Sequence, residues 1–453
     1  LVNHEFNKDW KLNFNSSFQD YDRESIGTER IQPAANGDWN RPYGRNKAVE
    51  QIFANQISLQ GKFQTGKIKH QLFTGIDTEI SFADAYTFRF FNPAVLDVNG
   101  DPVTVTIYGD PTNPVNIFDP ALYDATYDGP IMPSEVTRIV KTETTRLGIY
   151  AQDLISFGEK FKALLGLRYS YQEAKPITHA GGTETEGAIK NDRAFSPKVG
   201  LIYQPTKSIT LFSSYSNSFT PNTGIDINNE ALEPSIIDQI EAGIKNEFWK
   251  GKLTTNVTLY QIVNSNLVQT AEFDANGNIN TNPNLKALSG ETTSKGIELD
   301  ITYKPIDDFN IMAGYSYNDM RYTETTGLTG SFIEGDRLVR TPQHTANLSF
   351  FYTVPTGMFK NVSVGAIGNY IGDRFGGWNN QVDPTRPNGI WDREIPVNGY
   401  TTIDVSLGYN WKQFSLLCKL SNITNELNYT LHENYSVNPI APRQILTSLR
   451  YKF

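Results

Sequence analysis

Segments in which apolar and polar residues alternate recur along almost the whole sequence. Within Phe161–Tyr169, Gly296–Tyr303 and Thr402–Trp411, large apolar residues occupy one face of an extended chain, and charged or small polar residues occupy the other. The last residues, Gln444–Phe453, repeat this pattern and end on an aromatic side chain. A period of two is typical of β-strands, in which successive side chains point to opposite faces. Because no segment shows a convincing helical period, the sequence predicts an all-β protein.

The connections between these strands alternate strictly between short and long. The short ones are Asn7–Asp9, Gly61–Lys67, Ser156–Lys160, Gln204–Ser208, Glu247–Lys252, Lys304–Asp308, Val354–Lys360 and Lys412–Gln413. The long ones span roughly residues 22–50, 84–139, 171–194, 217–235, 264–291, 323–341, 371–397 and 425–444. Outer-membrane barrels keep short turns on the periplasmic side and long loops outside, whereas a soluble β-sandwich has no reason to maintain that asymmetry. The sequence therefore predicts a transmembrane antiparallel β-barrel.

The composition agrees with a barrel. Mean hydropathy is -0.42, and no stretch approaches the roughly 18 apolar residues that a spanning helix needs. Strands of a barrel look only mildly hydrophobic because half of their residues face a polar lumen. The net charge of -9 and the lack of a basic cluster argue against a nucleic-acid partner. The single cysteine, Cys418, excludes internal disulfides and cysteine-based metal sites, and we expect it to face lipid.

Counting segments gives about 17 strands, of which Leu1–Phe6 is the first. The final strand follows a long loop and therefore runs toward the periplasm, and the first strand precedes a short turn and runs the same way. Bacterial single-chain barrels have an even number of strands with both termini in the periplasm. We therefore expect that residues 1–453 form a partial barrel and that N-terminal strands are missing from it.

Several short motifs resemble those of TonB-dependent siderophore receptors, in the order in which that family carries them. They are His4–Trp10, Thr65–His70, Gly148–Asp153 with Leu164–Tyr169, Ser196–Pro205, Ser213–Pro221, Leu232–Pro234 with Gln239–Lys245, Ser294–Leu299, Thr341–Asn347, Tyr370–Arg374, Ser421–Asn425 and Pro442–Arg443. Each motif alone is weak, but together they cover the chain. The resemblance, most of all to ferrichrome and hydroxamate receptors, implies a barrel of 22 strands around an N-terminal plug domain that carries a TonB box.

The resemblance implies a function in the bacterial outer membrane of a Gram-negative cell. The protein is expected to bind a ferric siderophore and take it up with energy from the TonB complex, through a plug that these residues lack. Outer-membrane lipid and the barrel assembly machinery are the other expected partners. Tyr451 and Phe453 resemble the C-terminal aromatic signal that this machinery recognises. Iron would arrive already chelated, so the protein would need no cofactor or metal ligand of its own.

No catalytic motif is present, and we expect that the protein is not an enzyme. The sequence contains no His-Glu-x-x-His, no phosphate-binding glycine loop and no Gly-x-Ser-x-Gly. The five histidines are scattered. Asp97–Asp101 and Asp274–Asn278 have the oxygen-rich spacing of a calcium loop, but their Asn-Gly pair is foremost a hairpin-tip signal. Charges such as Lys162, Arg168, Glu241, Glu298, Asp300, Asp404 and Lys419 fall on the predicted lumen face.

The predicted long loops and strand ends are rich in aromatic residues. Those that we predict to bind ligand are Tyr86, Phe88, Phe90, Trp378, Trp391, Tyr429 and Tyr435. Aromatic walls with a few polar groups are typical of small-molecule sites, and siderophores are bulky and partly apolar. The competing interpretation is that these side chains form the aromatic girdle at the membrane interface.

Three alternatives remain open at the level of sequence. A receptor of the same family could take cobalamin, haem or a glycan instead of a siderophore, because the loops decide specificity. A passive porin-type channel would show the same strands and turns. A soluble, secreted all-β adhesin or structural protein would share the period of two but not the asymmetry of the connections.

Overall fold

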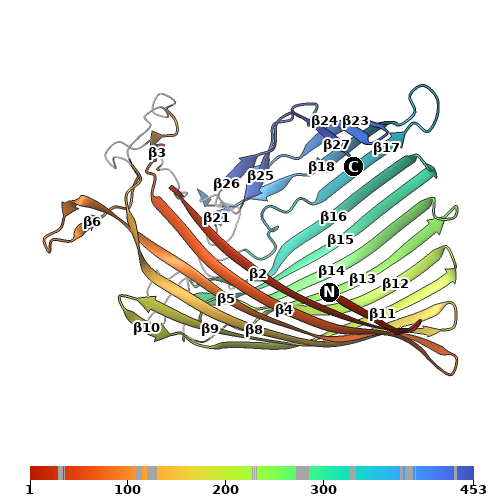
Figure 1. The fold of residues 1–453 in the computed structure, drawn as a ribbon, viewed down its shortest axis with the longest axis horizontal. Coiled ribbons are helices and arrows are strands. Elements are labelled where there is room, and N and C mark those ends of the chain that lie inside the picture. The colour runs from red at the N-terminus through yellow and green to blue at the C-terminus, as the bar shows by residue number, and fades with distance from the viewer. Residues whose placement is uncertain are drawn as a thin grey trace. The chain divides into compact units, whose positions relative to one another are not determined.

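The computed structural model describes all residues except 29–33, 35, 109–114, 120–129, 227, 229, 231, 272–284, 326–332, 378–380, 383–390, 393 and 433–435. Every regular element in the described part of the chain is a β-strand (Figure 1). Among these residues, none forms a helix long and apolar enough to cross a membrane. The prediction of an all-β protein is confirmed.

The long strands follow one another along the chain. They are β1 (Val2–Asn7), β2 (Trp10–Thr28), β4 (Tyr43–Thr65), β5 (Ile68–Leu96), β8 (Ser134–Phe157), β9 (Phe161–Ala180), β11 (Lys190–Thr206), β12 (Ile209–Thr220), β13 (Ser235–Phe248), β14 (Leu253–Thr270), β15 (Lys286–Ile306), β16 (Phe309–Thr325), β17 (His344–Thr353), β18 (Val362–Ile371), β23 (Tyr400–Trp411), β24 (Phe414–Ser421) and β27 (Gln444–Tyr451). We call these the wall strands. Their number matches the predicted count of about 17, and they alternate between short turns and long connections as predicted.

The remaining strands are short and lie in the long connections. They are β3 (Asp38–Trp39), β6 (Pro102–Thr104), β7 (Val115–Asn116), β10 (Thr183–Glu186), β19 (Arg374–Gly376), β20 (Gln381–Val382), β21 (Trp391–Asp392), β22 (Ile395–Val397), β25 (Tyr429–His432) and β26 (Ser436–Pro439). Most of them pair within or between loops, as β19 does with β22 and β25 with β26.

The chain divides into two compact units. Unit 1 comprises residues 1–61, 73–151 and 168–195, and unit 2 comprises residues 62–72, 152–167 and 196–453. In unit 1, β2 pairs antiparallel with β1 and with β4. In unit 2, each wall strand from β12 to β27 pairs antiparallel with the next wall strand along the chain. Antiparallel neighbours joined by short turns are the simplest way to satisfy every backbone N–H and C=O of a wall.

The wall strands have two chemically different faces. In unit 2, Leu259 of β14 and Leu407 of β23 are more than half exposed and belong to a face of large apolar side chains. The opposite face of the same strands carries polar pairs, such as Asn256 opposite Asp300 and Ser406 opposite Lys419. Exposed leucines on one face and charges on the other are the arrangement of a wall between lipid and a polar lumen.

Aromatic pairs lie next to the short turns of unit 2. The ring centroids of Phe161 and Tyr203 are 4.6 Å apart, and those of Trp249 and Tyr303 are 5.8 Å apart. Phe414 packs against Tyr451 at 4.9 Å, and Phe453 lies fully exposed beside Tyr451. Aromatic girdles mark the membrane interface of outer-membrane barrels. The predicted assembly residues Tyr451 and Phe453 are thus part of a girdle, and their recognition by the assembly machinery stays a prediction.

Several wall strands extend into regions that the sequence predicts as loops. β2 continues to Thr28, β5 to Leu96 and β9 to Ala180, although loops were expected from about residues 22, 84 and 171. The expected loop boundaries are wrong because backbone pairing continues through these residues, in β5 together with its apolar face and in β2 through polar side chains. In β2, for example, Glu24 lies opposite Lys47 of β4, a pairing that needs no apolar side chain.

Candidate functional site

Two groups of predicted ligand-binding residues differ in where the structure places them. The first group lies on β5 in unit 1. Phe90 is almost fully buried and stacks on Tyr43 of β4, with ring centroids 4.5 Å apart. Tyr108 covers the edge of Tyr43 at 5.6 Å, and the Tyr108 backbone N–H donates to the Arg41 carbonyl oxygen at 2.6 Å. Phe90 is therefore enclosed by protein.

Cations of β4 cover the other two aromatic residues of this group. The Arg45 guanidinium carbon lies 4.5 Å from the Phe88 ring centroid, and Lys47 Nζ lies 5.6 Å from that of Tyr86. Both cations also reach Glu24 of β2: Arg45 Nε donates to Glu24 Oε1 at 2.8 Å, and Lys47 Nζ lies 3.6 Å from Oε2. We call these contacts between β4 and β5 the cation–aromatic ladder.

The side of the wall on which the ladder lies follows from the alternation of β5. Tyr86, Phe88 and Phe90 share their face with Phe82 and Ile80, which are 50% and 38% exposed. The opposite face carries Asp77 and Glu79, which pair with arginines. The ladder thus continues the apolar face, as a membrane-interface girdle does. Nothing in this placement tests ligand binding by Tyr86, Phe88 and Phe90, which stays a prediction.

The second group lies in the last two long connections, in unit 2. Trp378 and Tyr435 fall outside the described residues. Trp391 begins β21, whose backbone pairs with Val382 of β20. Tyr429 begins β25 and is 41% exposed. Of the predicted residues in these connections, the described part of the chain thus allows side-chain analysis only for Tyr429.

Tyr429 is held by Arg374, which is only 4% exposed. The Arg374 guanidinium donates hydrogen bonds to four neutral oxygens: the carbonyls of Gly372, Asn398 and Tyr429 and the side-chain oxygen of Asn428. The Tyr400 ring lies 5.3 Å away. Asn428 also bonds the Tyr429 backbone N–H and the Asn398 carbonyl oxygen. We call Arg374, Phe375, Asn398, Asn428 and Tyr429 the β19 cluster.

Residues before β17 also contact the β19 cluster. The Arg340 backbone N–H donates to the Phe375 carbonyl oxygen at 2.7 Å, and the Arg337 guanidinium lies 5.1 Å from the Phe375 ring centroid. Burial lowers the pKa of Arg337, and the neighbouring cation of Arg321 acts in the same direction. Three successive long connections therefore meet at β19. The sequence offered only a partial signal for this cluster, the aromatic-flanked segment that begins at Arg374.

The polar face of the wall carries fixed ion pairs. In unit 1, Arg168 donates from two nitrogens to the two carboxylate oxygens of Asp77, each at 2.7 Å, and Arg146 pairs with Glu79. In unit 2, Lys419 lies 2.7 Å from Asp404. Bidentate guanidinium–carboxylate pairs are among the stronger polar contacts in proteins. Of the predicted lumen charges, Arg168 is thus paired with Asp77 within unit 1, and Asp404 is paired with Lys419 within unit 2.

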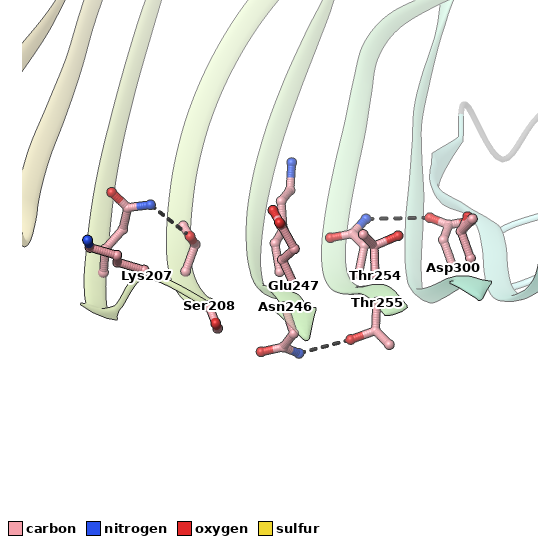
Figure 2. A pocket seen from close by; sticks show the side chains of 12 residues that line it. Lys207, Ser208, Asn246, Glu247, Thr254, Thr255 and Asp300 are labelled. Atoms are coloured by element: carbon pink, nitrogen blue, oxygen red, sulfur yellow. Dashed lines mark hydrogen bonds between the residues drawn. The ribbon is translucent and has the colours of Figure 1, made fainter. Parts of the chain in front are cut away.

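A polar hollow of about 400 Å³ lies on the wall at the short-turn end of β11–β15. Asn256 donates a hydrogen bond to Asp300. Figure 2 shows Asn246 and Thr255 bonded to each other, apart from Asp300. Lys245 is also part of the lining and lies over the Phe212 ring. The lining residues carry hydroxyl, amide and charged groups and include no aromatic ring, which fits contact with water or a polar protein surface better than with a siderophore. The sequence did not predict this hollow.

The two candidate calcium loops have different outcomes. Asp274–Asn278 lies outside the described residues. In Asp97–Asp101, one carboxylate oxygen of Asp97 accepts the backbone N–H groups of Asn99 and Asp101, and these bonds, that of Asp101 first, lower the pKa of Asp97. This is a closed turn of the hairpin-tip kind. Within the described part of the chain, no three His, Cys, Asp or Glu side chains gather as metal ligands would.

Comparison with known proteins identifies relatives along the whole chain. Residues 2–424 match the family described as "TonB dependent receptor-like, beta-barrel". The metal-pseudopaline receptor of Pseudomonas aeruginosa PAO1 is 26% identical over 461 residues, which cover 100% of this chain and 58% of the relative. The ferrichrome outer membrane transporter/phage receptor of Escherichia coli K12 is 24% identical, covering 93% and 51%.

Solved structures show the same fold. The siderophore receptor PiuA from Acinetobacter baumannii superposes with a TM-score of 0.76 at 18% identity, covering 100% of this chain and 63% of PiuA. The chain spans a little over half the length of the curated relatives that it matches.

Proposed function

Because this chain belongs to the family of TonB-dependent receptor β-barrels of the bacterial outer membrane, we propose that it binds a ferric siderophore or similar metal chelate and takes part in its uptake. The observation that carries the proposal is the meeting of three long connections at the β19 cluster. The wall strands of the same unit carry ion pairs such as Lys419–Asp404 on their polar face. A passive pore needs open loops, whereas a receptor needs a fixed surface against which a ligand can bind.

The class of ligand follows from two kinds of support. One relative is named for a metal–pseudopaline complex and the other for ferrichrome, and both names denote metal chelates or siderophores. The aromatic residues predicted in the loops suit a bulky, partly apolar chelate. In such a ligand the chelating groups already coordinate the metal, so the protein supplies a surface of matching shape and polar contacts. Binding and translocation, without covalent chemistry, are the proposed activity.

Energised uptake would depend on a plug domain that the TonB complex pulls. The polar face of the wall supports this part of the proposal. Ion pairs such as Arg168–Asp77 in unit 1 and the polar side chains beside Asp300 in unit 2 give each unit a polar face that a polar domain could contact and leave. An apolar lumen would leave the polar groups of such a domain without hydrogen-bond partners.

Ligand binding can be tested by fluorescence of the purified full-length protein. A ferric trihydroxamate should quench tryptophan emission, and replacing Trp378 and Trp391 together with Phe should remove most of the quenching. The control is Trp249→Phe. Trp249 lies in the short turn between β13 and β14, whereas Trp378 and Trp391 belong to a long connection.

The outcomes separate the candidate functions. Unchanged quenching in the Trp378 and Trp391 double variant would remove these residues from the site. If cobalamin, haem or an oligosaccharide binds and ferric chelates do not, the protein is a receptor for that ligand. Steady ion conductance of the full-length protein in planar bilayers, without binding of any of these ligands, would favour a porin.

A further inference from the structure

We propose that Arg374 is a positioning residue that fastens the last two long connections into a single binding surface. The proposal rests on the proposed function, because it explains how a ligand-binding surface is kept in place. The two connections are β18–β23 and β24–β27, both within unit 2, and the neighbouring residue Phe375 adds the preceding connection, β16–β17. Arg374 does not need to touch the ligand for this role.

The partners of Arg374 come from separate segments of the chain. Its guanidinium donates to the Asn398 carbonyl oxygen at 3.1 Å, just before β23, and to the Asn428 side-chain oxygen at 3.1 Å, just before β25. It also donates to the carbonyl oxygen of Tyr429, the predicted ligand-binding residue. One side chain therefore joins the start of β19, the end of the same connection and the next long connection.

The chemistry of this contact is specific to arginine. Within the described part of the chain, its partners are carbonyl and amide oxygens, and none of them is a carboxylate. A buried cation without a counter-ion is costly unless its donors are satisfied. The planar guanidinium has five donors in a fixed fork, whereas a lysine ammonium is a single point with three donors. Lysine at position 374 would keep the charge and lose the geometry.

Phe375 adds the third connection to the same strand. Its carbonyl oxygen accepts the Arg340 backbone N–H, and its ring lies beneath Arg337. On the other side, β19 pairs with β22, and Gly376 lies beside Leu431 of β25. The short strand β19 is therefore the shared element, and Arg374 is its main tie to β25.

A consequence follows for recognition. Residues of one long connection, such as Tyr429, are placed by a residue of another, so their contributions to binding depend on each other. Weakening Arg374 should loosen both connections and reduce ligand affinity even though no contact to the ligand is lost. A purely structural arginine would affect folding and leave the geometry between loops unchanged in the folded protein.

The test compares Arg374→Lys with Arg321→Lys in the full-length protein. Arg321 is also on the long-loop side of unit 2, but it has a carboxylate partner, Asp319, at 3.0 Å. Cys418 is replaced by Ser, and spin labels are attached to Ile395→Cys and Val437→Cys, at positions that are 44% and 52% exposed. The two labels report the distance between β22 and β26. Binding of a ferric trihydroxamate is measured on the same variants.

In the doubly labelled protein without further changes (the parent) and in Arg321→Lys, we expect one narrow distribution of the distance between β22 and β26. In Arg374→Lys we expect a broad distribution. Affinity should fall by at least about 10-fold in Arg374→Lys, the loss expected when hydrogen bonds to a charged group are removed. Heat-modifiable migration shows whether each variant is folded. If Arg374→Lys does not fold, Asn428→Ala keeps the cation, removes one acceptor and should broaden the same distance.

An unchanged narrow distance in folded Arg374→Lys or Asn428→Ala would overturn the proposal. Broadening without any change in affinity would overturn the positioning role, because the tie would then have no effect on binding. If the parent does not bind the chelate at all, the proposed function fails for that ligand class, while the distance measurement still decides whether Arg374 holds the connections together.

Discussion

The cation–aromatic ladder of unit 1 and the β19 cluster of unit 2 both combine arginine with aromatic rings, yet they are built differently. In the ladder, Arg45 and Phe88 meet because two long strands lie in register, and the side chains are partly exposed. In the β19 cluster, Arg374 is almost fully buried and bonds backbone oxygens of loops.

This difference teaches what holds each region in place. The strand ladder would survive the loss of any one side chain, because backbone hydrogen bonds of β4 and its neighbour β2 continue past it. The loops near β19 have only short strands of two to four residues, so side-chain bonds must supply the order that a ladder supplies elsewhere. Side chains should therefore matter more to stability in the β19 cluster than in the ladder.

The largest effect is expected for a charge on the apolar face of β5, which tests where the ladder lies. Ile76 is 48% exposed on the face of Phe82 and the ladder. If this face meets lipid near the midplane, Ile76→Arg should lower the free energy of unfolding by roughly 2–4 kcal/mol. Urea unfolding in lipid vesicles measures it, with Ile76→Met as the volume-matched control. Equal stability of the two variants would place the face, and the ladder with it, away from lipid.

A smaller but still large loss is expected for Arg374→Met. Methionine fills part of the volume of the arginine side chain. The buried oxygens of Asn398, Asn428 and Tyr429, however, lose their hydrogen-bond donor. Buried polar groups without partners cost about 1–3 kcal/mol, so we expect roughly 2–3 kcal/mol after local relaxation. The rate of limited proteolysis within the last two long connections measures this local loss. Proteolysis at the parent rate would mean that other contacts hold the loops.

The sequence contained most of the information about the wall and little about the β19 cluster. The period of two and the spacing of turns predicted the strand count, because both arise from local geometry. The partners of Tyr86 and Phe88 also follow from local geometry. Beside the short turn, Phe63 of β4 stacks on His70 of β5. Counting one residue back along β4 for each residue forward along β5 then pairs Lys47 with Tyr86, Arg45 with Phe88 and Tyr43 with Phe90. The loop boundaries at β2, β5 and β9 failed because backbone pairing continues there whatever the side chains are, as it does where Glu24 lies opposite Lys47.

The β19 cluster could not be predicted in the same way. Arg374 binds carbonyl oxygens, which every residue has, so no residue type in the sequence marks Gly372, Asn398 or Tyr429 as its partners. The contacts also join connections far apart along the chain, whose approach depends on the path of each loop. The aromatic residues of these connections did not indicate the buried arginine that binds the loop backbone.

The smallest effect is expected for Arg45→Met, the counterpart of Arg374→Met in the ladder. The Arg45 side chain is 28% exposed and its partner Glu24 is 39% exposed, so solvent screens their attraction. Methionine can still pack on the Phe88 ring, and Lys47 remains near Glu24. We expect a loss of at most about 1 kcal/mol in urea unfolding. A loss as large as that of Arg374→Met would show that single side chains hold the strand region too, and the contrast between the two regions would fail.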